Sequence, residues 1–459
     1  MNRQLINGDC LEELKKLDDN SVDLLCTDPP YGYGFMGKHW DTFKEKDSTK
    51  SQQVGWMSPG MKKDTYGMKE FFDPIWKECL RVLKPGALAF VMSAPRSDVQ
   101  TIMSQTLRDA GFDISFTPIY WTYASGFPKA MNVSKMIDKQ KGAKREVIGK
   151  NPNHRESEAL YELGFQGGKG DGNIVGGAVS DEAKKLDGSY GGFQPKPAVE
   201  VVLVAMKPIE EKGLLAQAQK NGKAVSWFDD CRIPFEEGHE PSDNQSMPDL
   251  RDVGKKSKEA IGIDKLSYGQ VENAERKEYE QNSDGRFPAN MLVSDEVLDD
   301  YSRYFSLDEW FSKNLKSLPE PVQQTFPFMI VPKASKSEKN DGLDNFDTKQ
   351  TTGGGGGVGD YIDDVNSASG KFGSEKAPSR NIHPTVKPLT LMNYLVVLGS
   401  RKGDVVLEPF AGSGTTALAC VSQERDYIAI EREEEYYEIA KARLDKLEQP
   451  LKMWEKFSG

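Results

Sequence analysis

The sequence predicts an α/β fold with a doubly wound, mainly parallel sheet, and two observations lead to this prediction. Strand-like apolar runs alternate with helix-like segments over the first 121 residues, and such alternation is typical of parallel sheets covered by helices. The alternation stops in the middle of the chain and returns after residue 387. The pattern therefore predicts one α/β domain formed by both ends of the chain, with a different region inserted between them.

The N-terminal part accounts for four expected strands and three expected helices. The second helix is followed by Lys84-Pro85-Gly86 and the third by Gly111, and proline and glycine are common signals for the end of a helix. The expected strands cover residues 4–7, 22–26, 87–92 and 114–121, and the expected helices cover 11–17, 71–83 and 97–110.

The middle of the chain gives weaker signals. Residues 164–192 are rich in glycine and polar residues, which predicts a loop or a mobile flap. The run AVEVVLVAM at 198–206 predicts one strong strand, residues 208–320 are charged and irregular, and the glycine run at 351–357 predicts a linker. The C-terminal part repeats the α/β pattern, with expected helices at 387–398, 414–423 and 434–447 and expected strands at 404–410 and 427–431.

The composition limits the class of protein. The chain has 459 residues, a net charge of −11, and five scattered cysteines without a Cys-x-x-Cys pair. No apolar run approaches the roughly 18 residues of a membrane span, and the first residues do not resemble a signal peptide. These features favour a protein of the reducing cytoplasm that has neither a disulfide framework nor a zinc site. The acidic charge does not indicate a nucleic-acid partner, but residues 129–155 contain eight basic and two acidic side chains, which predicts a local positive surface.

A glycine-rich motif, VVLEPFAGSGTTALA at 405–419, predicts a ligand site. A strand leads into a turn with Gly412 and Gly414 and then into a helix, and in this context small residues and free N–H groups let a ligand approach the backbone. Glu431 ends the next strand, where an acid can accept hydrogen bonds from ribose hydroxyls. The ligand is expected to be nucleoside-like, either a dinucleotide for hydride transfer or S-adenosylmethionine for methyl transfer.

A second motif, CTDPPYGYG at 26–34, favours methyl transfer. A turn at the end of a strand would explain the prolines alone, but the tetrapeptide Asp-Pro-Pro-Tyr also suits methylation of an amine on a base. An exocyclic amine is a poor nucleophile because its lone pair is delocalised into the ring. The Asp28 carboxylate and the Pro29 carbonyl can accept its two N–H bonds, and Tyr31 can stack on the base. We call these residues, 28–31, the amine clamp.

The two motifs together resemble those of a known family. TDPPYG and EPFAGSGTT are similar to the catalytic and cofactor motifs of β-class DNA amino methyltransferases, in which the catalytic motif comes first. RVLKPGALAF, GRFPAN and HPTVKP are similar to segments of adenine-type enzymes from phages and prophages. The resemblance implies a Rossmann-like, circularly permuted fold that uses S-adenosylmethionine. It also implies a catalytic half at 1–207, a target-recognition domain at 208–325 and a cofactor-binding half at 326–459.

The resemblance also assigns residues to sites. The expected catalytic residues are Asp28, Pro29, Pro30 and Tyr31. The expected S-adenosylmethionine site contains Asp9, Cys10, His383, Lys387, Glu408, Phe410, Gly412, Gly414, Thr415 and Glu431. In it, Lys387 pairs with the carboxylate of the donor, and Glu408 stands where the family usually has aspartate. The expected DNA contacts are Lys129, Lys144, Arg145 and Arg286, and no metal is expected.

The implied activity is methylation of the N6 amino group of an adenine that is flipped out of double-stranded DNA. The implied setting is the cytoplasm of a bacterium or a phage-infected cell, as in restriction–modification, and a homodimer is compatible with this activity. Aspartate at position 28 favours adenine over cytosine N4, where the family more often has serine. Cytosine N4, an RNA base and a non-catalytic nucleic-acid-binding relative are the alternatives.

Two further motifs are interpreted more simply. Residues 32–38 fit the first seven positions of a phosphate-binding P-loop, but His39 stands where that loop needs serine or threonine. The segment 32–40 is therefore interpreted as a mobile lid. Methylation at cytosine C5 needs a cysteine nucleophile, and no cysteine lies in the amine clamp.

Overall fold

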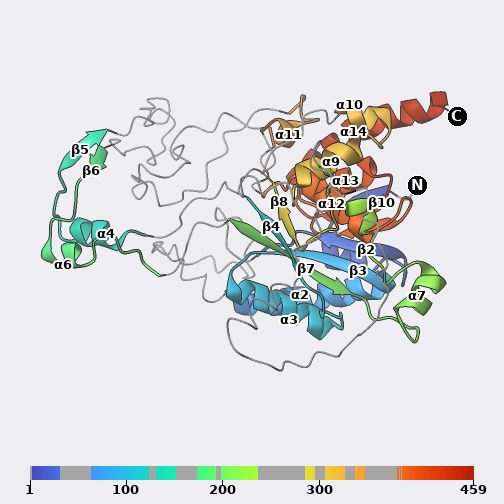
Figure 1. The fold of residues 1–459 in the computed structure, drawn as a ribbon, viewed down its shortest axis with the longest axis horizontal. Coiled ribbons are helices and arrows are strands. Elements are labelled where there is room, and N and C mark those ends of the chain that lie inside the picture. Colours follow the sequence, from blue (N-terminus) through green and yellow to red (C-terminus); the bar gives the residue numbers. More distant parts are fainter. Residues whose placement is uncertain are drawn as a thin grey trace, which may run out of the picture.

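A single eight-stranded sheet forms the centre of the residues that the computed structural model describes (Figure 1). Its strands lie in the order β1-β10-β9-β2-β3-β7-β4-β8, and of these only β7 runs antiparallel to its neighbours. The doubly wound, mainly parallel sheet predicted from the sequence is therefore confirmed. The strands are β1 (Arg3–Asn7), β2 (Val22–Thr27), β3 (Leu83–Ser93), β4 (Ile119–Thr122), β7 (Val199–Met206), β8 (Met291–Val293), β9 (Val405–Glu408) and β10 (Asp426–Glu431).

Some predicted features lie outside the described residues. The structure describes residues 3–31, 64–123, 131–150, 173–192, 198–235, 285–294, 305–325, 336–346, 380–381, 383 and 385–458. Lys129, the segment interpreted as a lid at 32–40 and the expected linker at 351–357 fall outside these ranges.

The two ends of the chain meet inside the sheet. The C-terminal strands β9 and β10 lie between β1 and β2, with Leu24 opposite Val406 and Leu25 opposite Leu407. From β9 the sheet continues through β10 to β1, and from β2 it continues in the other direction through β3. The boundary between β9 and β2 is thus a topological switch point, and ligands of open α/β sheets bind outside the carboxyl ends of strands at such a point.

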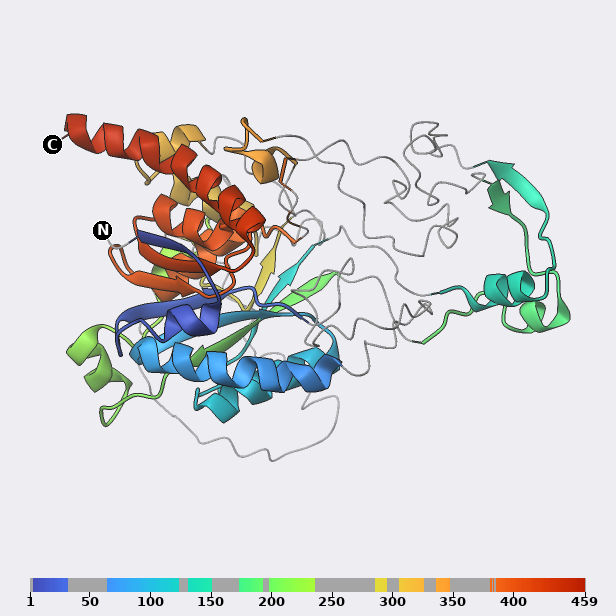
Figure 2. The same cartoon turned by 180° about the vertical axis from the view of Figure 1, so that it is seen from behind.

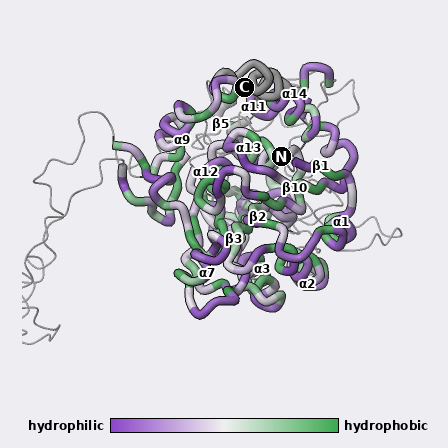
Figure 3. Tube along the Cα trace, turned by 90° about the vertical axis from the view of Figure 1, so that its right-hand side faces the viewer, coloured by the Kyte–Doolittle hydropathy of each residue, from purple (hydrophilic) through white to green (hydrophobic). Residues whose placement is uncertain are grey.

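Helices cover both faces of the sheet, which gives three layers (Figures 1 and 2). One face packs against α1 (Cys10–Leu14), α2 (Asp64–Val82) and α3 (Ser97–Ala110). The other packs against α9 (Leu307–Leu315), α12 (Leu389–Gly399), α13 (Thr415–Ser422) and α14 (Glu434–Ser458). Figure 3 shows hydrophobic positions gathered toward the sheet and hydrophilic positions along the outside. The shorter elements are α7 (Leu214–Asn221), η4 (Asp229–Cys231), α10 (Glu320–Thr325) and α11 (Lys336–Asn340).

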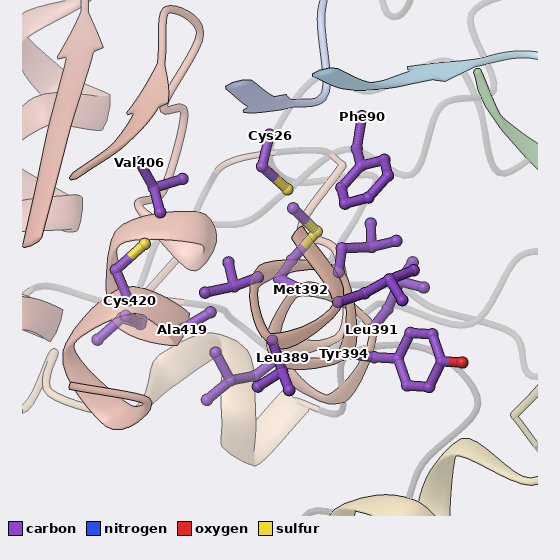
Figure 4. Packing of buried hydrophobic residues seen from close by; sticks show 14 of the residues in the cluster. Cys26, Phe90, Leu389, Leu391, Met392, Tyr394, Val406, Ala419 and Cys420 are labelled. Carbon is purple, nitrogen blue, oxygen red and sulfur yellow. The ribbon is translucent and has the colours of Figure 1, made fainter. Parts of the chain in front are cut away.

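Helix α12 is the centre of the larger hydrophobic cluster. All eleven of its residues are buried, because its sequence, LTLMNYLVVLG, has apolar side chains on every side and such a helix must be covered all round. Met392 lies beneath Cys26 and Phe90 of the sheet, and Tyr394 points away from Ala419 and Cys420 of α13 (Figure 4). The Trp310 ring of α9 covers Tyr394, with 5.0 Å between ring centroids.

The start of β3 differs from the sequence prediction. Lys84-Pro85-Gly86 was expected to end a helix outside the sheet, but β3 begins at Leu83 and includes these residues. The register between β2 and β3 shifts at this point, since Val22 lies opposite Leu83 and Leu24 opposite Leu88. Such a bulge accommodates a proline, which cannot donate to the strand ladder.

Other elements also differ from the expected pattern. Strand β4 begins at Ile119 rather than at 114, and α14 continues to Ser458. The segment expected as a loop at 164–192 contains a strand and a helix, and the segment expected to be irregular at 208–320 contains α7, β8 and α9. These elements are short and depend on tertiary partners, for example β8 on β4, so local propensity does not reveal them.

Residues 131–150 and 173–192 form a small lobe with its own contacts, drawn in cyan and green at one end of Figure 1. It contains α4 (Val133–Gln140), β5 (Val147–Lys150), β6 (Asn173–Val175) and α6 (Asp181–Lys185). The buried Asp138 carboxylate accepts hydrogen bonds from the Val179 and Ser180 N–H groups at 3.1 and 2.9 Å. It also accepts one from Arg145 Nε at 2.8 Å. One buried carboxylate therefore joins the two segments of the lobe.

Substituting Gly399 with alanine should destabilise the protein, although alanine is the better helix former by about 1 kcal/mol. A Cβ there would lie 2.6 Å from Leu24 Cδ1 and 2.7 Å from Phe90 Cε2, and overpacking a core costs about 1–3 kcal/mol. After the helix-propensity gain is subtracted, the expected net loss in the free energy of unfolding is up to about 2 kcal/mol, measured by urea titration. The control is Gly177→Ala, where a Cβ has nothing within 4 Å; equal stability of the two variants would contradict the packing of α12.

Candidate functional site

The amine clamp lies where β2 leaves the sheet at its carboxyl end. Strand β2 ends at Thr27 and residues 28–31 follow directly. The Tyr31 hydroxyl donates a hydrogen bond to Asp28 Oδ1 at 2.7 Å. The Asp28 side chain is 19% exposed, so its carboxylate is fixed by a neighbour and still accessible from the edge of the sheet.

The glycine-rich turn follows β9, the strand next to β2. Gly412 and Gly414 have φ angles of +54° and +79°, a region that residues with a Cβ rarely adopt. A Cβ on Gly412 would lie 2.7 Å from His383 Nε2, and one on Gly414 would lie 2.9 Å from Ala440 Cβ. Both backbone conformation and close packing therefore require glycine at these two positions.

Glu408 joins the clamp strand to the glycine-rich turn. Its Oε1 accepts hydrogen bonds from the Thr27 hydroxyl at 2.5 Å and from the Phe410 N–H at 3.1 Å, and its Oε2 accepts one from the Thr416 hydroxyl at 2.8 Å. Burial raises the pKa of this carboxyl to about 8. Both oxygens of Glu408 are thus bonded within the protein, and we call this set of contacts the Glu408 bridge.

Two acids lie beside the turn at the ends of β10 and β1. Glu431 Oε2 accepts a hydrogen bond from the Gly412 N–H at 2.7 Å, and burial raises the pKa of the Glu431 carboxyl to about 7. Asp9 follows β1, in which Asn7 lies opposite Glu431, and it caps α1 by accepting from the Leu11 N–H at 3.0 Å. The structure therefore brings Asp9, Glu431 and Gly412 together, as the sequence predicts.

Other residues predicted for this site support its backbone. His383 is half-buried, and its shielding from water lowers its pKa to about 3, so the ring that covers Gly412 is neutral at physiological pH. Its centroid lies 4.6 Å from that of Tyr436. The Cys10 thiol is buried and its pKa is raised to about 12, and Thr415 Oγ1 lies 3.4 Å from Arg443 Nη1.

Phe410 anchors the turn in the core. Its ring lies 6.2, 6.0 and 6.2 Å from the rings of Phe71, Phe72 and Trp76 of α2. These contacts are in the range of edge-on and tilted aromatic pairs. They hold the start of the turn against the helix layer that also covers β2 and β3.

Lys387 lies beside the amine clamp. Its ammonium contacts Asp28 Oδ2 and lies 3.4 Å from Glu200 Oε2, and its pairing with a carboxylate of the donor stays a prediction. The ammonium also lies 5.8 Å from the centre of the Tyr31 ring. Burial lowers the pKa of Lys387, but the Asp28 and Glu200 carboxylates more than offset this and raise it, so this lysine belongs electrostatically to the clamp.

Two residues of this cluster were not predicted. Glu200 lies near the start of β7, which runs antiparallel and so brings its first residues to the edge where β2 and β3 end. Tyr123 follows β4, and its hydroxyl lies 3.5 Å from Glu200 Oε1. The available signal was Glu200 itself, the single charged residue within AVEVVLVAM, since an acid in an apolar strand needs a local reason.

The residues predicted to contact DNA lie in different surroundings. Lys144 is exposed. The Arg145 side chain is only 8% exposed and pairs with Asp138 inside the small lobe. The Arg286 guanidinium lies 4.9 Å from the Phe235 ring. Contact with DNA stays a prediction for these residues, and Arg145 also has a clear structural role.

The described residues contain neither a metal-binding cluster nor a membrane-spanning helix. No three His, Cys, Asp or Glu side chains there are grouped so that they could hold a metal ion. No helix there has both the length and the apolar character needed to cross a membrane.

The fold and the site together define a class of protein. The residues predicted to bind the donor lie at the carboxyl ends of β1, β10 and β9, and the amine clamp follows the adjacent strand β2. A family model described as DNA methylase, N6_N4_Mtase, matches residues 22–442. The chain therefore belongs to this DNA methylase family.

Several curated proteins are similar to parts of the chain. The Type II methyltransferase M2.MboI of Moraxella bovis is 44% identical over 70 residues, which is 15% of this chain and 26% of that protein. M.HpaI of Haemophilus parainfluenzae is 45% identical over 67 residues, 15% of this chain and 21% of that protein. M2.LlaDCHI of Lactococcus lactis subsp. cremoris is 38% identical over 88 residues, 19% of this chain and 32% of that protein. The matches thus span about a fifth to a third of these relatives.

Solved structures give a more distant likeness. The cytosine-N4-specific PvuII DNA methyltransferase is 12% identical with a TM-score of 0.39, and the match covers 96% of this chain and 86% of that one. The complex of M1.HpyAVI with SAM is 13% identical with a TM-score of 0.34, covering 96% and 98%. The family assignment rests on the family model alone.

Replacing Glu408 with glutamine should change how stability depends on pH. The pKa of this carboxyl rises from 4.5 to about 8 on folding, so between these values the folded state holds a proton that the unfolded chain releases. The wild-type free energy of unfolding should therefore fall as pH rises from 5 to 8.5, by on the order of a few kcal/mol from this group.

Glutamine cannot titrate, so E408Q should gain stability relative to wild type over the same range, as measured by urea unfolding at both pH values. The exposed Glu438 on α14 provides the control, Glu438→Gln. A constant difference between E408Q and wild type at pH 5 and pH 8.5 would contradict a buried, protonated Glu408.

Proposed function

We propose that this protein transfers a methyl group from S-adenosylmethionine to the N6 amino group of a flipped adenine in double-stranded DNA. The observation that carries the proposal is the adjacency of two sites. The amine clamp and the glycine-rich turn follow neighbouring strands at the switch point of the sheet, and the Glu408 bridge joins them. Membership of the DNA methylase family supports the same reaction.

The residues around the glycine-rich turn fit the methyl donor. The turn follows β9 at the carboxyl edge of the sheet, and Gly412 and Gly414 carry no side chain of their own, which lets a ligand approach the backbone. In the proposal, Glu431 accepts hydrogen bonds from ribose hydroxyls, and Asp9 accepts one from the adenine amine. The bound donor supplies an activated methyl group on a sulfonium.

The amine clamp prepares the other reactant. Asp28 and the Pro29 carbonyl accept the two N–H bonds of the target amine, which orients its nitrogen toward the methyl group and stabilises the positive charge that develops during attack. The prolines restrict the backbone, so the carbonyl is held in place before the base arrives. Tyr31 offers its ring face to the base and its hydroxyl to Asp28, which fixes the carboxylate.

DNA contacts lie outside this edge in the proposal. The exposed basic side chains of the small lobe, such as Lys144, would bind phosphates, which positions the duplex without reading its sequence. Base-specific contacts are assigned to 208–325. Within that range β8 extends the sheet and α9 covers α12, which leaves its remaining residues for target recognition. The target base reaches the clamp by flipping, because N6 is paired and stacked in the duplex.

The direct test is expression in a host without DNA methylation, followed by sequencing that detects modified bases. The proposal expects N6-methyladenine in one sequence context. N4-methylcytosine would keep the enzyme class and change the target, and the absence of any modified base would overturn the proposal.

Asp28→Ala should abolish transfer and leave donor binding largely intact. Removing the clamp carboxylate takes away an interaction made with the amine as charge develops, so the transfer rate should fall by at least about a hundredfold. Calorimetry should give a donor Kd within about threefold of wild type, because Asp28 is bonded to Tyr31 and Lys387 and not to the glycine-rich turn. The control is Asp109→Ala on α3, whose carboxylate pairs with Lys69 at 2.6 Å; near-wild-type transfer by D28A would refute the clamp.

A further inference from the structure

The Lys387 ammonium lies between two carboxylates at the catalytic edge. It contacts Asp28 Oδ2 directly and Glu200 Oε2 at 3.4 Å, and its side chain is only 10% exposed. A buried ammonium is costly without a partner, so wherever this group moves it needs a carboxylate. Both available carboxylates are within reach of one lysine.

The contact with Asp28 occupies a position that the target amine needs. Asp28 Oδ1 already accepts the hydrogen bond of Tyr31, and Oδ2 is the oxygen that faces Lys387. An ammonium and an exocyclic amine both donate N–H bonds to a carboxylate. We therefore expect them to compete for Oδ2, the oxygen that contacts the lysine in this structure.

Glu200 has the capacity to take the ammonium over. Its Oε2 is shielded from solvent and accepts no hydrogen bond from any described residue, and its Oε1 has only the long 3.5 Å contact with the Tyr123 hydroxyl. A buried carboxylate oxygen without a hydrogen bond is unfavourable. A closer approach of Lys387 by a fraction of an ångström would satisfy it.

We propose that Glu200 is a positioning residue for methyl transfer, which accepts the Lys387 ammonium when the target amine displaces it from Asp28. This inference rests on the proposed role of Asp28. Before the base enters, one ammonium is shared by two carboxylates. After the exchange, Glu200 and Lys387 form a neutral pair, and Asp28 keeps its negative charge next to the nitrogen that becomes positive.

The test replaces Glu200 with glutamine, which keeps the shape and removes the charge. Without the second carboxylate the ammonium stays on Asp28, so the single-turnover transfer rate at saturating donor and DNA should fall about tenfold to a hundredfold. The donor Kd should not change. The control is Glu210→Gln, a residue that follows the end of β7. The Glu210 carboxylate lies 3.3 Å from Lys220 Nζ, and the transfer rate of this variant should equal that of wild type.

A second arm distinguishes this role from a merely structural one. In a Lys387→Met background there is no ammonium to exchange, and Glu200 only adds a negative charge beside Asp28. E200Q should then cause no further loss, and a gain is equally consistent with the proposal. Equal fold-losses in both backgrounds would mean that Glu200 does not act through Lys387, and a wild-type rate for E200Q alone would also overturn the inference.

Glu200→Asp provides a variant that keeps the charge if E200Q does not fold. The aspartate carboxylate is one methylene further from Lys387. The transfer rate of this variant should therefore fall in the wild-type background and not in the Lys387→Met background. Equal losses in the two backgrounds would again overturn the inference. Failure of the proposed role of Asp28 would be seen separately, as full activity of D28A, and failure of the proposed function as the absence of any modified base.

Discussion

The Glu408 carboxyl is the contact on which the rest of the site depends. It accepts hydrogen bonds from Thr27, from the Phe410 N–H and from Thr416, so one buried group holds the end of β2, the glycine-rich turn and the start of α13. These elements come from opposite ends of the chain, 381 residues apart in the case of Thr27 and Glu408. In the proposed mechanism, the bridge sets the distance between the bound methyl donor and the clamped amine.

The acids at the carboxyl edge of the sheet differ in their surroundings. The pKa values of the Glu408 and Glu431 carboxyls are raised to about 8 and 7 because these groups are shielded from water. Asp28 instead lies next to the Lys387 ammonium. The edge thus has two kinds of acid: those at the ends of β9 and β10, which are bonded to backbone and hydroxyl groups, and the clamp acid, which is balanced by a cation. This separation suits a reaction in which a cationic methyl group moves toward a neutral amine.

Much of the site was predictable, because each motif lies at the end of a strong strand pattern and the carboxyl ends of adjacent parallel strands share one edge. The meeting of Asp28, Gly412 and Glu431 at one edge was predicted in this way. Glu200 was missed because its position depends on β7 running antiparallel, and the contact of Lys387 with Asp28 was missed because it spans 359 residues. Arg145 was counted as positive surface, since composition does not show which basic groups are paired internally.

The most direct measurement is single-turnover transfer of a labelled methyl group to duplex DNA by Thr27→Val. This change removes one hydroxyl from the Glu408 bridge and alters neither Asp28 nor the glycine-rich turn. The account predicts a rate lower by about tenfold or more with donor Kd within about threefold of wild type, while Thr101→Val, on the exposed side of α3, has no effect. A wild-type rate in folded T27V would contradict the claim that the bridge aligns the two reactants.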